Sequence, residues 1–137
     1  MVRTPWKSLA FLLALGGSVY AQAKCLNSVR ELQENNVKIK WHEATSDDGK
    51  PMWIYINGNR GLTYQGIKAG DVWFMGTVSV CLIGDQIRIS LRNTVVTDKV
   101  PLLVRKLFPT RQTAKIANDR IEFKDYGWSG TFVGEEH

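Results

Sequence analysis

The chain has 137 residues, with 18 Lys and Arg against 13 Asp and Glu, which gives a formal charge of +5. This length suits one small domain and not two. The basic residues are scattered among acidic ones, so the composition excludes the dense positive surface of a nucleic-acid-binding protein. The mild positive charge favours a weak approach to anionic lipid or polysaccharide.

Residues 1–23 have the organisation of a secretory signal peptide. Two positive residues come first, an apolar run follows at residues 9–15, and Ala21 and Ala23 fit the small residues that precede a cleavage site. The apolar run is too short to span a bilayer. We expect cleavage after Ala21 or Ala23, and a periplasmic or secreted protein without a transmembrane segment. Loss of the two leading cations lowers the formal charge to +3.

Both cysteines, Cys25 and Cys81, follow the expected cleavage site. In an oxidising compartment such a pair favours a disulfide, worth about 4 kcal/mol on the loop-entropy model. Acylation of Cys25, as in a bacterial lipoprotein, is disfavoured because Lys24 occupies a place where a small residue is required. The sequence contains no Asn-x-Ser/Thr acceptor, which agrees with a bacterial origin.

The first element predicted after the signal peptide is a short helix at residues 28–35. Ser28 can cap its N-terminus, and Glu31 stands three residues later as in a capping box. From residue 37 the hydrophobic period changes from helical spacing to strict alternation. A β-rich domain over residues 24–137 follows from this change.

Alternating β-branched and aromatic residues, separated by Gly-, Asn- and Asp-containing turns, predict a series of short strands. The clear segments are residues 37–42, 52–56, 62–65, 72–82, 86–91, 94–97, 120–124 and 128–133. We therefore expect a mainly all-β fold, a small antiparallel barrel or sandwich of about seven to nine strands. Periodicity does not choose between barrel and sandwich.

Residues 101–108 interrupt the alternation with an apolar and basic stretch between two prolines. Pro101 suits the first position of a helix and Pro109 ends one, so a second short helix is expected there. One interpretation is a cap whose Leu and Val side chains pack over one end of the sheet. The other is a lid or interfacial segment with an exposed binding surface. The residues assigned to that partner or anion surface are Arg105, Lys106, Phe108 and Arg111.

Aromatic residues are numerous in the predicted strands. On residues 52–56 the alternation places Trp53 and Tyr55 on one face and isoleucines on the other, so both faces are apolar. Such a strand is enclosed between layers or lines a cavity. If the fold is an open barrel, the rings expected around an apolar or sugar ligand are Trp53, Tyr55, Tyr64 and Trp73. The alternative is that the rings only fill the core.

Catalytic and metal-binding patterns are scarce. A nucleophile–base arrangement would have to use His42, which lies on the polar side of its predicted strand. The sequence has no phosphate-binding loop, dinucleotide fingerprint, nucleophile elbow or zinc-protease motif. We expect no catalytic residues, no metal and no cofactor.

The order of a short helix, a meander of strands and a final strand with Trp128 and Gly130 resembles calycin-type small barrels. The resemblance is one of architecture, because the lipocalin Gly-x-Trp signature and the avidin-type motif are absent. The sequence thus predicts a non-catalytic envelope protein that binds an apolar small molecule or a glycan. The alternatives are a protein-interaction or inhibitor module that uses residues 101–111, and a small hydrolase.

Overall fold

Antiparallel strands make up most of the fold, which is taken from a computed structural model that describes residues 23–125 and 128–135. The expected signal peptide, residues 1–23, lies outside the described residues except for its last position. The strands are β3 (Lys24–Leu26), β4 (Lys40–Glu43), β5 (Trp53–Asn57), β6 (Leu62–Lys68), β7 (Asp71–Ile83), β8 (Gln86–Val96), β9 (Gln112–Ala117), β10 (Arg120–Asp125) and β11 (Trp128–Gly134). The helices are α1 (Val29–Glu34) and α2 (Leu102–Leu107). The all-β prediction with two short helices is confirmed.

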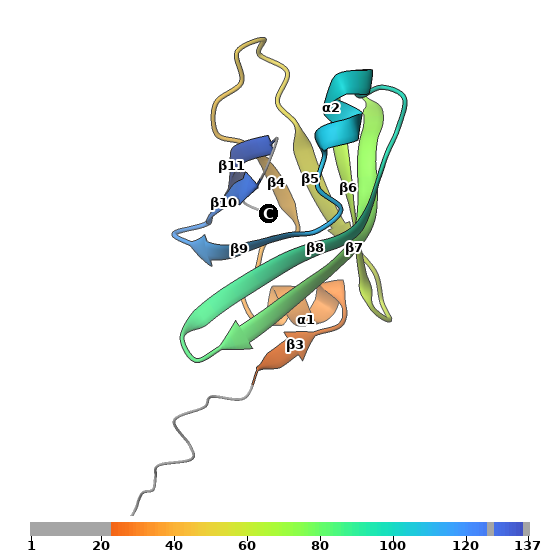
Figure 1. Cartoon of the computed structure of the whole chain (residues 1–137). Coiled ribbons are helices and arrows are strands. Elements are labelled where there is room, and N and C mark those ends of the chain that lie inside the picture. Colours follow the sequence, from red (N-terminus) through yellow and green to blue (C-terminus); the bar gives the residue numbers. More distant parts are fainter. Residues whose placement is uncertain (1–22, 126–127, 136–137) are drawn as a thin grey trace, which may run out of the picture.

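The sheet closes on itself. From β4 to β11 each strand pairs with the next, and β11 pairs back with β4, all antiparallel (Figure 1). The result is an eight-stranded up-and-down barrel, which decides between the barrel and the sandwich. Gly134 lies at the closing seam, opposite Trp41. A Cβ at Gly134 would lie 2.7 Å from the Lys38 side chain, so a larger residue would require this side chain to shift.

Inward-facing side chains fill the barrel. The largest fully buried residues with apolar or aromatic side chains are Trp41, Ile54, Ile56, Tyr64, Phe74, Ile89, Leu91, Ile121, Phe123 and Phe132, together with Leu32 of α1. They come from alternate positions of the strands, because successive side chains point to opposite faces of a sheet. An eight-stranded barrel is just wide enough for side chains to fill its interior. The barrel interior is therefore a hydrophobic core filled by these side chains.

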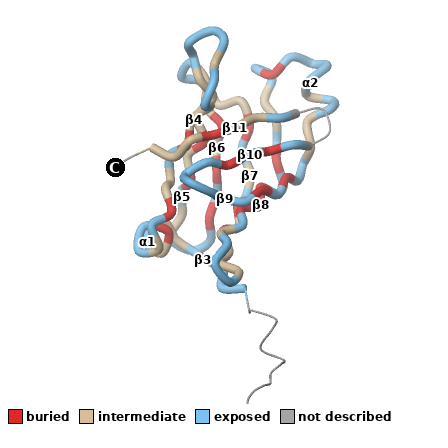
Figure 2. Tube along the Cα trace, turned by 90° about the vertical axis from the view of Figure 1, so that its left-hand side faces the viewer, coloured by how far each residue is buried: buried red, intermediate tan, exposed pale blue. Residues whose placement is uncertain are grey.

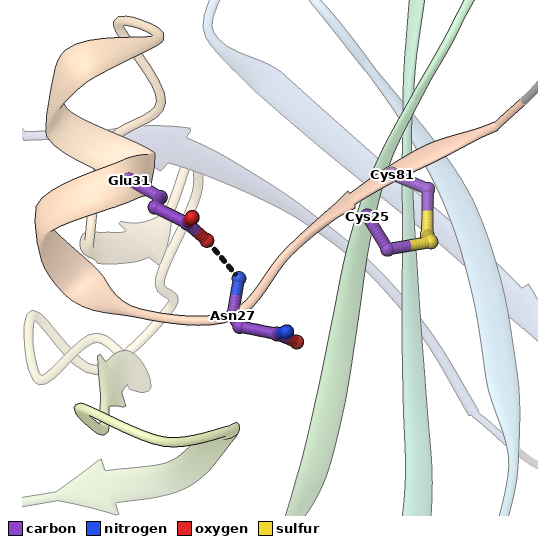
Figure 3. The surroundings of a disulfide bond; sticks show 4 residues. All are labelled: Cys25, Asn27, Glu31 and Cys81. Atoms are coloured by element: carbon purple, nitrogen blue, oxygen red, sulfur yellow. Dashed lines mark hydrogen bonds between the residues drawn. A yellow bond between two sulfur atoms is a disulfide. The ribbon is translucent and has the colours of Figure 1, made fainter.

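Helix α1 covers one end of the barrel. The Ser28 hydroxyl accepts a hydrogen bond from the Glu31 backbone N–H (3.2 Å), and the Glu31 carboxylate accepts one from the Asn27 N–H (2.5 Å; Figure 3). The Ser28 cap is the one that the Ser28 and Glu31 spacing predicts, whereas the Glu31 carboxylate bonds the N–H of Asn27, one residue before the N-cap N–H expected in a capping box. Leu32 is fully buried and fixes the helix to the core. No helix in the described part of the chain is long and apolar enough to cross a membrane.

The N-terminal strand β3 is attached to the barrel covalently. It pairs with β7 beyond the end of β6, and Cys25 lies directly opposite Cys81. The two cysteines form a disulfide (Figure 3). The predicted Cys25–Cys81 bond is confirmed, and it ties the start of the described chain to a central strand.

The structure corrects the predicted elements in four places, one of which is strand β3 (Lys24–Leu26), which was not predicted. Residues 86–91 and 94–97 belong largely to one strand, β8, which continues through Asn93 in a left-handed conformation (φ 54°). Pro101 is the N-cap of α2 and not its first helical residue. Strand β9 was not predicted, although a two-residue turn follows it. Both turn residues, Asn118 and Asp119, have positive φ, the geometry of a type I′ hairpin.

Candidate functional site

A cavity of about 320 Å³ lies at the end of the barrel opposite α1, between the barrel rim and the segment that carries α2. Figure 1 shows this end at the top, with α2 on one side of it. We call this cavity the mouth cup. Its lining residues are Glu43, Met52, Lys68, Trp73, Phe74, Val100, Pro101, Val104, Phe108, Ser129 and Phe132.

Buried rings from the barrel interior take part in the lining of the mouth cup. Phe74 and Phe132 are 2% and 1% exposed, so they belong to both the core and the cavity. The Phe74 ring lies across β6 at Gly66, where a Cβ would come within 2.3 Å of the ring. The absence of a side chain at Gly66 therefore allows the Phe74 ring to pack across β6.

The segment between β8 and β9 forms the wall on the α2 side. Thr97 fixes its start, because its N–H donates to the Trp73 carbonyl (2.9 Å) and its hydroxyl donates to the Val72 carbonyl (2.8 Å). Near its end, the Thr94 N–H donates to the Thr110 carbonyl (3.2 Å). Between these anchors Phe108 packs against Phe74, with ring centroids 5.2 Å apart. The wall is thus held at both ends.

Lys68 provides the positive charge of the mouth cup. Its ammonium lies 3.3 Å from the Asp48 carboxylate and 5.6 Å from the centroid of the Trp73 ring. Hydrogen bonds from the Lys50 N–H and the Ser46 hydroxyl, with a smaller effect of Lys68, lower the pKa of Asp48 from 3.8 to about 2. Asp48 is therefore ionised at neutral pH, and it positions the amine.

Glu43 and Ser129 are the other polar residues of the lining. One Glu43 carboxylate oxygen accepts a hydrogen bond from the Met52 N–H at 2.6 Å. This bond holds the carboxylate at the rim, where β4 ends. The cup thus combines apolar walls with a few fixed polar groups, which is the general composition of small-molecule sites.

The four aromatic residues predicted to surround a ligand are not brought together. Trp73 lines the mouth cup. Trp53 and Tyr55 alternate with inward-facing isoleucines, so they lie on the outer wall, stacked with centroids 5.9 Å apart. Tyr64 is buried in the interior, where its hydroxyl is hydrogen-bonded to that of Thr94 and burial raises its pKa.

The four residues predicted to form a partner or anion surface are also divided. Phe108 lines the mouth cup, and the Arg105 Nε donates to the Val100 carbonyl at 3.0 Å. Lys106 and Arg111 are exposed. The leucines of α2 do not pack as a cap, since no residue of this helix is buried.

His42, the residue required by the hydrolase hypothesis, is on the outer wall. Its ring lies 5.0 Å from that of Trp53, and its Nε2 lies 3.8 Å from a Glu135 carboxylate oxygen. Within residues 23–125 and 128–135, no three metal-ligating side chains form a group that could hold a metal ion. The predictions of no catalysis and no cofactor stay predictions.

Several cup residues were not predicted, because they come from separate parts of the chain. These are Glu43, Met52, Lys68, Phe74, Val100, Pro101, Val104, Ser129 and Phe132. One signal in the sequence could have indicated part of this lining, since the two prolines around α2 mark a segment that leaves the sheet and returns to it.

Comparison of the chain with family models, curated proteins and solved structures finds no match.

Proposed function

We propose that the protein is a non-catalytic binding protein that takes a small, mainly apolar molecule into the mouth cup. The observation that carries the proposal is the lining, in which eight of the eleven side chains are apolar. Burial of apolar surface is the main driving force available in such a site. A glycan would need polar partners for most of its hydroxyl groups, so the lining favours the apolar ligand of the two.

Lys68 supports a ligand with an anionic end. The Lys68 side chain is 25% exposed, and Asp48 and Trp73 hold its ammonium beside the apolar walls. A carboxylate placed there would gain a charge-assisted hydrogen bond while its apolar part lies against Trp73 and Phe108. The proposed ligand class is therefore a small carboxylic acid with an apolar body.

Export to the periplasm or the exterior is part of this proposal. The Cys25–Cys81 disulfide supports an oxidising compartment. The same bond engages the sulfur that a lipoprotein would acylate. Determination of the mature N-terminal mass tests this part. We expect a chain that begins at Gln22 or Lys24, and an acylated Cys25 would contradict it.

Native mass spectrometry of protein purified gently from its own compartment tests the main proposal first. We expect a small extra mass that organic extraction removes. A stoichiometric protein adduct in its place would favour the alternative, an interaction or inhibitor module that uses residues 101–111.

Calorimetric titration with decanoic acid and decanol then locates the site. Val104 lines the cup and is 38% exposed, so Val104→Phe fills space without removing core packing, and it should weaken binding by at least about tenfold. Lys68→Met should abolish the preference for the acid over the alcohol. Tyr55→Ala, on the outer wall, is the matched control. Loss of binding in Tyr55→Ala with retention in Val104→Phe would move the site to the outer wall and overturn the proposal.

A further inference from the structure

Helix α2 exposes more large apolar side chains than any other element in the described chain. Leu102, Leu103 and Leu107 are 59%, 73% and 42% exposed. Outside α2, the only large hydrophobic residues exposed among those described are Met75 and Val95. Figure 2 shows the helix as an exposed projection at the mouth of the barrel. Leaving three leucines in water is unfavourable unless they have a partner.

The charged residues next to these leucines in the sequence are positive, and the nearest acidic residue in the chain is Asp98. Arg105 and Lys106 lie in the last turn of α2, and no acidic residue occurs from Lys99 to Arg111. Lys99 pairs with Asp71 at 4.0 Å, which leaves Lys106 and Arg111 as exposed cations that precede and follow Leu107 in the chain. A surface of leucines bordered by cations is complementary to an anionic partner with an apolar interior.

We infer that α2 docks on an anionic lipid surface, with Leu102, Leu103 and Leu107 inserted among the acyl chains near the headgroups. Lys106 and Arg111 would lie at the level of the lipid phosphates, where each cation adds to binding. A second copy of this chain is a poorer partner, because two such basic segments repel each other. The helix has six residues and cannot span the bilayer, so the attachment is peripheral and reversible.

Docking would bring the mouth cup to the lipid. Val104, one residue after Leu103, lines the cup, so the helix that meets the membrane is also the wall of the cavity. If the proposed function holds, the ligand can pass between bilayer and cup without crossing water. The docking itself does not depend on that function.

Vesicle sedimentation tests the inference. Purified disulfide-bonded protein is mixed with vesicles of phosphatidylcholine alone or with an equal amount of phosphatidylglycerol, at low and high salt. We expect binding to the anionic vesicles that weakens with salt. Leu103→Ser and Lys106→Glu should each lower the affinity by about tenfold. All variants share one N-terminus, so a difference in vesicle binding comes from the substitution.

The chain offers matched controls for both substitutions. Val95 is 63% exposed on β8, and Arg88 is exposed at the far end of the same strand, so Val95→Ser and Arg88→Glu should bind as the parent does. Val104→Phe should block decanoic acid binding and retain vesicle binding, which separates failure of docking from failure of the proposed function. No vesicle binding, or equal binding by all variants, would overturn the inference. Self-association that Leu103→Ser abolishes, without vesicle binding, would assign the leucines to a second copy.

Discussion

The two ends of the barrel are built in opposite ways. At one end α1 is capped by side chains, buries Leu32 completely, and lies near a strand that a disulfide holds in place. At the other end α2 has no side-chain cap, buries no residue and exposes three leucines beside a cavity. Stability is therefore concentrated at the α1 end, while the apolar surface left for binding is concentrated at the mouth.

The largest expected effect comes from removing the covalent link at the α1 end. Cys25→Ser with Cys81→Ser should lower the free energy of unfolding by about 4 kcal/mol, because the unfolded chain regains the entropy of an open loop. Urea denaturation measures this loss. Where the variant remains folded, ligand affinity of the mouth cup should be unchanged. A free energy of unfolding equal to that of the parent would show that the disulfide does not stabilise the α1 end.

A pair of leucines compares the two helices directly. Leu32→Ala in α1 should cost about 3 kcal/mol, because it leaves a cavity in the core. Leu103→Ala in α2 removes a side chain that is 73% exposed, so it should cost less than about 0.5 kcal/mol. The denaturant concentrations at the unfolding midpoints of the two variants, compared with that of the parent, measure these losses. Similar losses would mean that α2 is part of the stable core.

Gly66 connects the core to the mouth cup. Gly66→Ala would press a methyl group on the Phe74 ring, and we expect about 2 kcal/mol of destabilisation together with weaker ligand binding. A double-mutant cycle with Phe74→Leu checks the cause, because a smaller side chain at 74 should relieve most of the clash. Additive effects of the two substitutions would disprove this contact.

The smallest expected effect is on the pH dependence of stability. The pKa of Asp48 falls from 3.8 to about 2 on folding, so its contribution is complete above about pH 4 and is lost as the pH drops toward 2. The Asp48 carboxyl titration followed by NMR should therefore have its midpoint near pH 2. Asp48→Asn should flatten the stability profile in this window.

Local patterns predicted much of the fold. The Ser28 and Glu31 spacing predicted α1 and its capping, and the paired cysteines predicted the disulfide. Barrel closure could not be predicted, because it rests on the pairing of β11 with β4, which are distant in the chain. Alternation specifies which residues share a face and leaves open which residues are distant partners.

The candidate site was harder to predict for two physical reasons. Strand β5 is apolar on both faces, so its sequence does not say whether Ile54 or Trp53 points inward. In the structure the isoleucines are inside and the aromatic rings are outside. In addition, the mouth cup joins residues from strand ends and from the α2 segment, and only Trp73 and Phe108 among them were predicted as site residues.

The unequal lengths of β6 and β7 have a consequence for solubility. Strand β7 has 13 residues and its partner β6 has 7, so the last part of β7 would be an open sheet edge without β3, which pairs with residues 80–82. Open edges invite pairing between molecules. The disulfide thus keeps a protective strand over the edge. Reduction should release it, and the reduced protein should associate edge to edge at concentrations where the oxidised protein remains monomeric.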